Sequence, residues 1–361
     1  MRWFRLVPMC IVIVVLTLMG GVGGVGGVGG AHAAPSGAST TSTTYSAPRE
    51  GAKVILGEFS IDGPAILATY QPQTVLAWTG TDAAHHLNLL TSADGLHYSA
   101  KVILPETSLW RPALAFIDSG RGAPYGTIVL AWTGTDSAHT LNMEFISLPG
   151  LTVREKITFW GETSFTAPAL ATVNGDINSD VYLAWAGTDA AHTLNVIHHT
   201  TSIESNSKQT LWGWNSVSRP NLSPDQNATS GTALILAWTG VNHHLYFAQS
   251  ADRTHWTMPS SSPLSQQSAW APSLIAFYAT NMPAYWLAWT GSGSTSTQQL
   301  SVAYTQQYPT WSAAGTSTML TETAISSPAL AYNGVNRQVL LAWTGTNAAH
   351  SLNVAVVDVT A

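Results

Sequence analysis

The chain almost lacks cysteine. Its 361 residues include a single one, Cys10, which lies early in an apolar N-terminal segment that we expect to be removed. That early position argues against a lipid-modified cysteine. Export normally permits disulfides, but the mature chain would have no cysteine to form them. Its fold must therefore rest on packing and hydrogen bonds alone.

Charged residues are also scarce, at 9% of the chain. The 13 basic residues are outnumbered by 19 acidic ones, for a formal net charge of −6, and no basic stretch is visible. Nucleic acid and anionic membranes are therefore poor candidates as partners. Tryptophan, serine, threonine and glycine are abundant instead, which suits an extracellular β-protein that uses neutral polar and aromatic groups.

The N-terminus has the pattern of a secretion signal. Arg2 and Arg5 precede an apolar stretch from Leu6 to Met19, and Ala31-His32-Ala33 forms a small-x-small cleavage site. We expect a secreted protein with no membrane contact after cleavage, or a membrane-tethered one if the signal is retained. These features divide the chain into a signal peptide (1–33), a Ser/Thr-rich flexible linker (34–51) and one repeat domain (52–361).

One motif, LAWTG or LAWAG, occurs six times. Its tryptophans recur every 51–54 residues, and a Pro-Ala-Leu-Ala sequence or a variant of it precedes each copy. The tryptophans are Trp78, Trp132, Trp185, Trp238, Trp289 and Trp343, and the prolines are Pro64, Pro112, Pro168, Pro220, Pro272 and Pro328. Two motifs that repeat in step indicate six copies of one unit of roughly 50 residues.

Each unit is predicted to form four short strands. Ala113–Ile117 illustrates the first strand, the LAWTG motif ends the second, and Leu87–Leu90 and Lys101–Leu104 illustrate the third and fourth. Gly, Pro, Asn and Asp separate these runs, and helical periodicity is absent. The pattern predicts an all-β fold, a six-bladed β-propeller of four-stranded blades, with the six tryptophans packed between neighbouring blades.

The two ends of the repeat domain predict a closed ring. Lys53–Glu58 nearly duplicates Lys101–Glu106, which is a fourth strand and its exit. The sixth repeat stops after a third strand, Ser351–Val359, and has no fourth strand of its own. The N-terminal strand can therefore complete the last blade, so that neither end leaves a frayed sheet.

Two segments resemble motifs of the sialidase-like, Asp-box (BNR-type) propellers. Ser92–Tyr98 and Ser250–Trp256 are similar to shortened Asp-boxes, and both fall between the third and fourth strands of a repeat. Leu109–Leu114 is similar to the Arg-Ile-Pro-Ala-Leu stretch that opens the first sialidase blade. The resemblance implies a propeller fold. The sialidases of this superfamily have an arginine triad, a Tyr–Glu nucleophile pair and an Asp acid/base, and the resemblance raises the question of whether this chain has them too. Here only Arg111 and Arg219 lie in loops that lead into a repeat, so we do not expect the sialidase catalytic set.

The loop that follows each LAWTG motif, here called the Asp/His loop, is itself repeated. Its candidate ligand-binding residues are Asp82 and His85, Asp136 and His139, Asp189 and His192, and Asn347 and His350. They can serve a tight turn, because Asp and Asn satisfy backbone donors. They can also form a ring of sugar sites, because carboxylates accept hydrogen bonds from hydroxyls. The D-x-x-H spacing alone is weak evidence for a metal, and we predict no metal and no other cofactor.

The loop that leads into each repeat and ends in its proline, here called the entry loop, shares a rim with the Asp/His loops. It adds the candidates Trp110, Arg111, Arg219 and Trp270. Aromatic faces for sugar stacking are available from Trp110, Phe165, Trp212, Trp214 and Trp270, for which burial is the alternative. Four glutamates at equivalent positions are expected to brace loops: Glu58, Glu106, Glu162 and Glu322.

Similar loop chemistry in four or more repeats favours several weak, equivalent contacts. Catalysis instead needs dissimilar groups that converge on one point. The leading hypothesis is a secreted, non-enzymatic, lectin-like monomer that binds polysaccharide or glycoconjugates. One alternative is a divergent sialidase-like glycoside hydrolase or lyase that uses Asp62, Trp110, Arg111 and Arg219. The other is a protein-interaction scaffold with flat, uncharged rims.

Overall fold

The computed structural model describes residues 46–69, 73–118, 126–173, 180–200, 205–226, 233–260, 262–279, 282–291, 298–306, 308 and 317–359. The predicted signal peptide, with Cys10, and the predicted linker up to residue 45 lie outside these ranges. The described residues form 23 β-strands and no helix. A helix long and apolar enough to cross a membrane is accordingly not found among them.

The first three repeats each form a four-stranded antiparallel sheet in which neighbours in sequence are neighbours in space. The first sheet contains β2 (Ala65–Ala68), β3 (Thr74–Thr79), β4 (His86–Ser92) and β5 (Val102–Thr107). The second contains β6 (Ala113–Ile117), β7 (Thr127–Thr133), β8 (Thr140–Ser147) and β9 (Thr152–Thr163). The third contains β10 (Ala169–Val173), β11 (Asp180–Ala186), β12 (Thr193–Thr200) and β13 (Ser205–Asn215). The LAWTG motif ends the second strand of each sheet.

A fourth sheet joins the two ends of the described chain. Its order is β1 (Arg49–Phe59), β23 (Ser351–Asp358), β22 (Gln338–Thr344) and β21 (Ala329–Asn333). Strand β1 pairs antiparallel with β23, with Lys53 opposite Ala355 and Ile55 opposite Asn353. The first residues of β1 lie in the segment that the sequence predicts as linker.

The fourth and fifth repeats share one seven-stranded sheet. It contains β14 (Asn221–Asp225), β15 (Ala233–Thr239), β16 (Leu245–Ser250), β17 (Ser273–Ala279), β18 (Met282–Thr290), β19 (Gln299–Thr305) and β20 (Ser317–Thr323). One parallel pair, Asp225 with Ala276, joins β14 to β17.

The fourth repeat has three strands where four were predicted. The described residues between β16 and β17 make isolated bridges instead, among them Gln249 with Thr257 and His244 with Gln267. Pro259 and Pro263 interrupt this segment, and a proline has no N–H to donate to a strand ladder. The outer edge of this repeat is therefore irregular.

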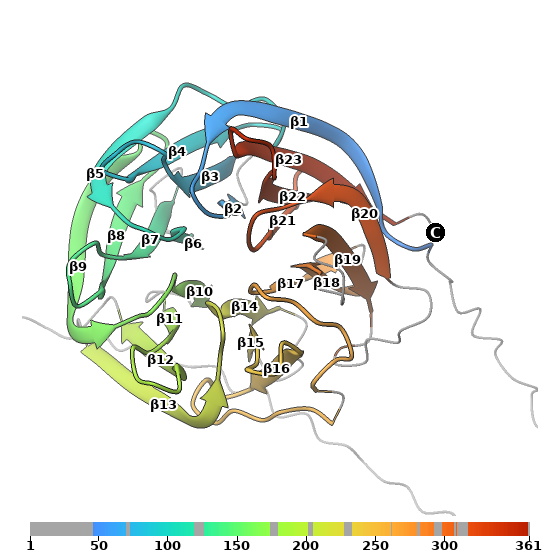
Figure 1. Cartoon of the computed structure of the whole chain (residues 1–361). Helices are drawn as coiled ribbons and strands as arrows, with labels where there is room; N and C mark the ends of the chain where they lie inside the picture. Colours follow the sequence, from blue (N-terminus) through green and yellow to red (C-terminus); the bar gives the residue numbers. More distant parts are fainter. Residues whose placement is uncertain are drawn as a thin grey trace, which may run out of the picture. The chain divides into compact units, whose positions relative to one another are not determined.

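The sheets are arranged around a central space, with the first strand of each repeat innermost and β1, β5, β9, β13 and β20 outermost (Figure 1). Successive inner strands contact one another in the order β2, β6, β10, β14, β17 and β21. Strand β21 also contacts β2, although the two are far apart in sequence.

Each LAWTG tryptophan packs against the preceding repeat, as the sequence predicts. All six have exposed fractions of 6% or less. Trp132 lies in a cluster with Val75 of the first repeat, and Trp78 lies in a cluster with Leu340 of the last repeat. The interior is therefore a series of apolar layers between sheets, and burial of these side chains is the main source of stability.

The four equivalent glutamates form ion pairs between neighbouring outer strands. The pairs have N–O distances of 2.5–2.7 Å and are Lys101–Glu58, Lys156–Glu106, Lys208–Glu162 and Lys53–Glu322. Three of these lysines also lie 5.2–5.3 Å from the ring centroid of a LAWTG tryptophan in their own sheet. The glutamates thus brace one repeat against the next and are not gathered at one point.

Candidate functional site

The Asp/His loops are held by their own acidic residue. In the second repeat a carboxylate oxygen of Asp136 accepts hydrogen bonds from the Ala138 amide at 3.0 Å and the Thr140 hydroxyl at 3.0 Å. Asp189 makes the same bonds one repeat later. In the last repeat the Asn347 side-chain oxygen accepts from the Ser351 amide at 2.9 Å. The turn interpretation of these residues therefore has direct support.

These bonds also affect the charge of the loop. Burial alone would raise the pKa of Asp136, but hydrogen bonds from the Thr140 hydroxyl and from backbone amides outweigh it and hold that pKa below its ordinary value. The same balance lowers the pKa of Asp82 and Asp189. The three carboxylates are ionised near neutral pH, with part of their accepting capacity already used inside the loop.

The histidine that ends each Asp/His loop has a left-handed backbone. The positive φ angles, between 51° and 63°, belong to His85, His139, His192, His243 and His350. Non-glycine residues seldom adopt this conformation, although histidine tolerates it better than most. The His85 carbonyl accepts the Ser108 amide at 3.1 Å, so each histidine links its loop to the start of an entry loop. The rings of His85, His139, His192 and His350 are half-buried.

Each entry loop is clamped between two repeats. The Ser108 hydroxyl donates to the Thr133 carbonyl of the next repeat at 2.9 Å, and the Thr79 hydroxyl of the previous repeat donates to the Trp110 carbonyl at 2.6 Å. At the chain ends, the Thr344 hydroxyl donates to the Asp62 carbonyl at 2.7 Å. These bonds fix the position of each entry loop beside an Asp/His loop.

The third repeat has a different clamp, because alanine replaces the LAWTG threonine. Ala186 has no hydroxyl to donate. The Ser216 hydroxyl lies 2.7 Å from the Ser218 carbonyl and 3.0 Å from the Thr239 carbonyl, and its one proton is shared between them. The entry-loop carbonyl is therefore partly satisfied from within its own loop.

Aromatic side chains of two entry loops meet the histidine of the repeat that they enter. Phe165 stacks on His192 with ring centroids 3.7 Å apart and an interplanar angle of 21°. Trp110 lies 5.0 Å from His139 at a tilt of 54°. The structure thus brings Trp110 and the Asp136–His139 loop together at the rim. Trp270 is half-buried in the equivalent entry loop, but the loop after the fifth LAWTG motif contains no Asp or His in its sequence.

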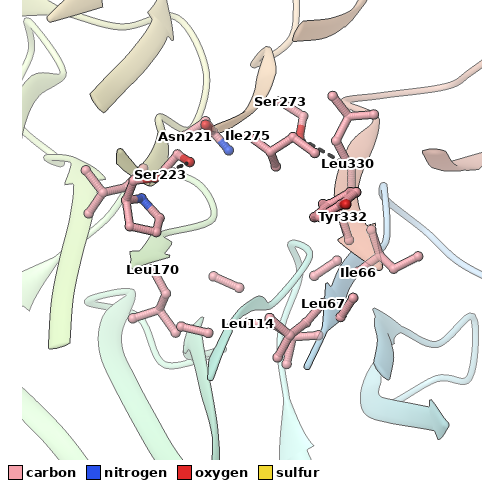
Figure 2. A pocket seen from close by; sticks show the side chains of 18 of the residues that line it. Ile66, Leu67, Leu114, Leu170, Asn221, Ser223, Ser273, Ile275, Leu330 and Tyr332 are labelled. Carbon is pink, nitrogen blue, oxygen red and sulfur yellow. Dashed lines mark hydrogen bonds between the residues drawn. The ribbon is translucent and has the colours of Figure 1, made fainter. Parts of the chain in front are cut away.

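Arg111 and Arg219 lie apart from these rim contacts, at a central cavity of about 370 Å³. The inner strands line it mainly with apolar side chains, such as Leu67, Leu114 and Leu330 (Figure 2). The Ser273 hydroxyl accepts the Leu330 amide at 2.9 Å across two neighbouring inner strands. The sequence does not show which entry-loop residues face the rim and which face the axis, because the residue before each proline lies in the same loop as the rim aromatics.

The two axial arginines are almost fully buried, with exposed fractions of 4% and 6%. The Arg111 Nη1 donates to the carbonyls of Ser327 and Pro328 at 3.2 and 3.1 Å. The Arg219 Nη1 donates to the Pro220 carbonyl at 3.0 Å. The Nε atom of each arginine is buried without a hydrogen-bond partner. Two guanidinium groups at the axis are therefore only partly satisfied by the protein.

Burial and proximity both weaken the protonation of these arginines. Burial first, and then the charge of Arg219, lower the pKa of Arg111 well below its ordinary value, while Asp62 opposes the shift. Burial lowers the pKa of Arg219 to about 10, and Asp62 again opposes it. Asp62 also accepts the Arg111 amide at 3.0 Å. The cluster carries one carboxylate for two guanidinium groups, which leaves an excess of positive charge.

The two Ser-Ala-Asp turns are structural. The Asp94 carboxylate accepts the amides of Leu96 and His97 at 2.9 and 2.8 Å, and these bonds together with the His97 ring hold its pKa well below the ordinary value. Asp252 is bound in the same way by Thr254 and His255. In the described residues no group of three or more His, Cys, Asp or Glu side chains is placed to hold a metal ion.

Solved structures with a similar fold share little sequence with this chain. A mutant of AofleA from Arthrobotrys oligospora aligns with a TM-score of 0.62 at 10% identity, over 87% of both chains. The Aleuria aurantia lectin in complex with α-methyl-L-fucoside gives 0.60 at 12% identity, over 84% of this chain and 96% of the lectin. The Trypanosoma rangeli sialidase gives 0.52 at 11% identity, over 83% of this chain and 55% of the sialidase. No family model and no curated protein matches. The chain therefore has a β-propeller fold, similar to that of six-bladed lectins and of sialidases.

Proposed function

We propose that this protein is a lectin-like β-propeller that binds carbohydrate where an entry loop meets the Asp/His loop of the repeat it enters. One observation carries the proposal. A histidine recurs in a left-handed conformation, and in two repeats its ring lies against an aromatic side chain of the neighbouring loop. Such a backbone costs about 1 kcal/mol. The His85 and His192 Nδ1 atoms lie 3.3 and 3.2 Å from glycine carbonyls of their own loops, so the ring contacts with Trp110 and Phe165 carry the argument for binding.

The chemistry of these junctions suits sugars. An aromatic face packs against the C–H side of a pyranose ring. The loop carboxylates and the imidazole nitrogens can accept or donate hydrogen bonds to hydroxyls. Similar junctions on one rigid domain would bind a multivalent glycan by avidity. The similarity in fold to a lectin solved with a fucoside makes α-methyl-L-fucoside the first ligand to test.

A glycan array and calorimetry with α-methyl-L-fucoside test this proposal. We expect weak binding at more than one equivalent site, because the junctions repeat. Trp110→Ala and Phe165→Ala should each reduce the number of sites by one and leave the remaining sites unchanged. Leu109→Ala is the matched control, since Leu109 precedes Trp110 and is 45% exposed. Folded protein that binds no glycan on the array would refute the proposal.

We also propose that the repeats form six blades in a closed ring. Contacts between the inner strands β21 and β2 support this proposal, as does the outer position of β1 beside β23. The seven-stranded sheet would then be two blades, because only one residue pair joins β14 to β17. In a closed ring, removal of residues 1–59 should expose the β23 amides to rapid hydrogen exchange, while removal of residues 1–45 should not. Unchanged protection of β23 in the shorter chain would exclude closure by β1.

A second candidate function is the binding of an acidic sugar at the axis. The excess positive charge of Arg111 and Arg219 beside Asp62 favours it, and both arginines line the central cavity. Hydrolysis is not favoured. Most glycosidases use two carboxylates that flank the bond that breaks, and sialidases use a Tyr–Glu pair with an Asp acid/base. The described lining residues of the cavity include no acidic side chain for either set.

Turnover and binding assays separate these alternatives. We expect no release of 4-methylumbelliferone from sialoside, fucoside or glucoside substrates. If the wild type hydrolyses one of these substrates and Arg111→Lys abolishes that hydrolysis, the hydrolase alternative would be established instead. Binding of N-acetylneuraminic acid that survives Trp110→Ala and is lost in Arg219→Gln would assign an acidic sugar to the axis.

We further propose that the protein is secreted and acts as a monomer. The signal-like residues 1–33 support secretion. The N-terminal sequence of protein recovered from culture medium should start at Ala34. Light scattering at micromolar concentration should give the mass of a single chain, and a dimer mass would contradict the monomer.

A further inference from the structure

Two tryptophans of this protein are almost fully exposed. Trp160 on β9 and Trp212 on β13 have exposed fractions of 85% and 82%. Trp214, two residues after Trp212, instead stacks on Trp238 with ring centroids 5.4 Å apart. Placing a whole indole in water forgoes its large hydrophobic contribution. The fold itself therefore gives no packing reason for these two side chains.

Both tryptophans belong to an insertion that only the second and third repeats carry among the described outer strands. In the first repeat, Asn88 of β4 pairs with Ile103 and His86 pairs with Thr107. A step of two residues on β4 therefore corresponds to four residues on the outer strand. In the second repeat the outer strand advances five, from Thr158 to Thr163, for the same step on β8. The third repeat also advances five, from Thr210 to Asn215. The outer strands β1 and β20 follow the first repeat.

The inserted residue adds to a register shift at each tryptophan, whose indole faces solvent. A glycine with positive φ follows each tryptophan, Gly161 at 88° and Gly213 at 84°, and the space around a Cβ at either position is open. Bulges re-aim side chains and are often associated with functional sites. The same device in two adjacent repeats, and an exposed indole in each case, indicates a binding surface.

The strands that carry the two indoles are linked by one ion pair. Lys208 of β13 forms an ion pair with Glu162 of β9 at 2.5 Å, so the strands that carry Trp160 and Trp212 are tied together and the ion pair has no net charge. A charged ligand would find no counter-charge in this pair. An anionic membrane surface would require basic residues around the indoles, and the chain has no basic stretch. Charge complementarity therefore points to an uncharged, hydroxyl-rich ligand.

We propose that Trp160 and Trp212 form a two-point aromatic platform on the circumference of the propeller that binds a neutral polysaccharide chain. Each indole stacks on the C–H face of one sugar ring. Because both are fixed to one rigid domain, the second contact is intramolecular and raises the avidity for a long chain over a short one. The platform is separate from the rim junctions, which hold single sugars under the proposed function.

Affinity electrophoresis in gels that contain hydroxyethylcellulose, laminarin or galactomannan tests the platform. We expect the full chain to be retarded by at least one of these neutral polysaccharides. Trp160→Ala or Trp212→Ala should weaken binding at least fivefold, and the double variant should abolish it. Trp160→Phe should retain part of the retardation. The matched controls are Ile103→Ala and Met319→Ala on other outer strands, where the side chains are 59% and 64% exposed.

The possible outcomes separate this platform from the rim sites. In calorimetry with α-methyl-L-fucoside, the Trp160/Trp212 double variant should behave like the wild type. If the rim proposal is wrong, neither protein will bind the fucoside, and the platform can still be tested with the polysaccharides. Three results would overturn the platform. The first is that no polysaccharide retards the protein, and the second is that wild type and double variant are retarded equally. The third is that the wild type binds neutral phosphatidylcholine vesicles but no polysaccharide, and that the double variant loses the vesicle binding.

Discussion

At the rim, four repeats present nearly the same loop, whereas at the axis the six residues that precede the prolines are of four different kinds. Those axial residues are Gly63, Arg111, Ala167, Arg219, Ala271 and Ser327. The rim carboxylates accept hydrogen bonds from their own turns. The axial arginines keep buried Nε atoms without a partner. The two regions thus differ both in symmetry and in how well their polar groups are satisfied.

This comparison shows how structural residues can be distinguished from functional residues in a repeat protein. Asp136 and its equivalents are repeated because every turn needs the same hydrogen bonds, so part of their repetition reflects folding. Arg111 and Arg219 break the repeat and are costly to bury. A repeated residue should therefore be assigned to ligand binding only if it makes a contact that the turn does not need. His139 and His192 make such contacts with Trp110 and Phe165.

The largest expected effect is at the axis. Arg111→Leu should lower the free energy of unfolding by about 3 kcal/mol, because the Ser327 and Pro328 carbonyls lose their buried donor. Urea unfolding measures the change, with Arg154→Leu on the exposed face of β9 as the control. A more stable Arg111→Leu variant would contradict this prediction and show that the arginine is kept at a cost to the fold.

A smaller effect is expected at the rim. Asp136→Ala should cost roughly 1–2 kcal/mol, because the Ala138 amide and the Thr140 hydroxyl lose their acceptor. Ser137→Ala in the same exposed loop is the matched control. If Asp136→Ala leaves thermal unfolding unchanged, the turn does not depend on this carboxylate, and its repetition would have to reflect binding instead.

The second sheet has its own break in symmetry, the buried Glu144 on β8. Burial first, and then the charge of Glu106, raise the pKa of Glu144 to about 7. The folded protein then binds this proton more tightly than the unfolded chain does, so the contribution to stability is present at low pH and is lost as pH rises to about 7. Glu144→Gln should reduce the stability difference between pH 5 and pH 8 by about 1 kcal/mol in urea unfolding. Parallel pH profiles for the two proteins would disprove this role.

The smallest effect is expected where the third repeat departs from the clamp. Ala186→Thr should stabilise the protein by no more than about 0.5 kcal/mol, because the Ser218 carbonyl already accepts the Ser216 hydroxyl. Thr133→Val, which removes a 2.7 Å bond to the Thr166 carbonyl, should cost about 1 kcal/mol. Calorimetric melting compares the two, and equal effects of opposite sign would show that the serine does not replace the threonine.

Much of the fold is predictable from local patterns. The predicted first strand Ala113–Ile117 coincides with β6, and the duplicate of a fourth strand at Lys53–Glu58 lies within β1, paired with β23. The missing outer strand of the fourth repeat was not predicted, because the effect of Pro259 and Pro263 depends on which strand they would have to join.

The candidate site was harder to predict. The sequence named residues of the Asp/His loops, Trp110 and Arg111 as candidates, and it placed them all on one rim. In the structure Trp110 lies beside His139, while Arg111 lines the central cavity. Adjacent residues of one loop point to different regions, and no local pattern distinguishes them. Trp160 was missed altogether, although the additional residue before Gly161 is visible once the repeats are aligned.

The sequence by itself determined the number of repeats, the strand pattern within them and the burial of the LAWTG tryptophans. These features depend on residues that are close together in the chain, where turn chemistry and strand periodicity act. Only the tertiary structure decided which side chains from different repeats meet, at the axis and at the rim junctions. It also decided that Trp160 and Trp212 face water, because their exposure depends on whether any other part of the described chain covers β9 and β13.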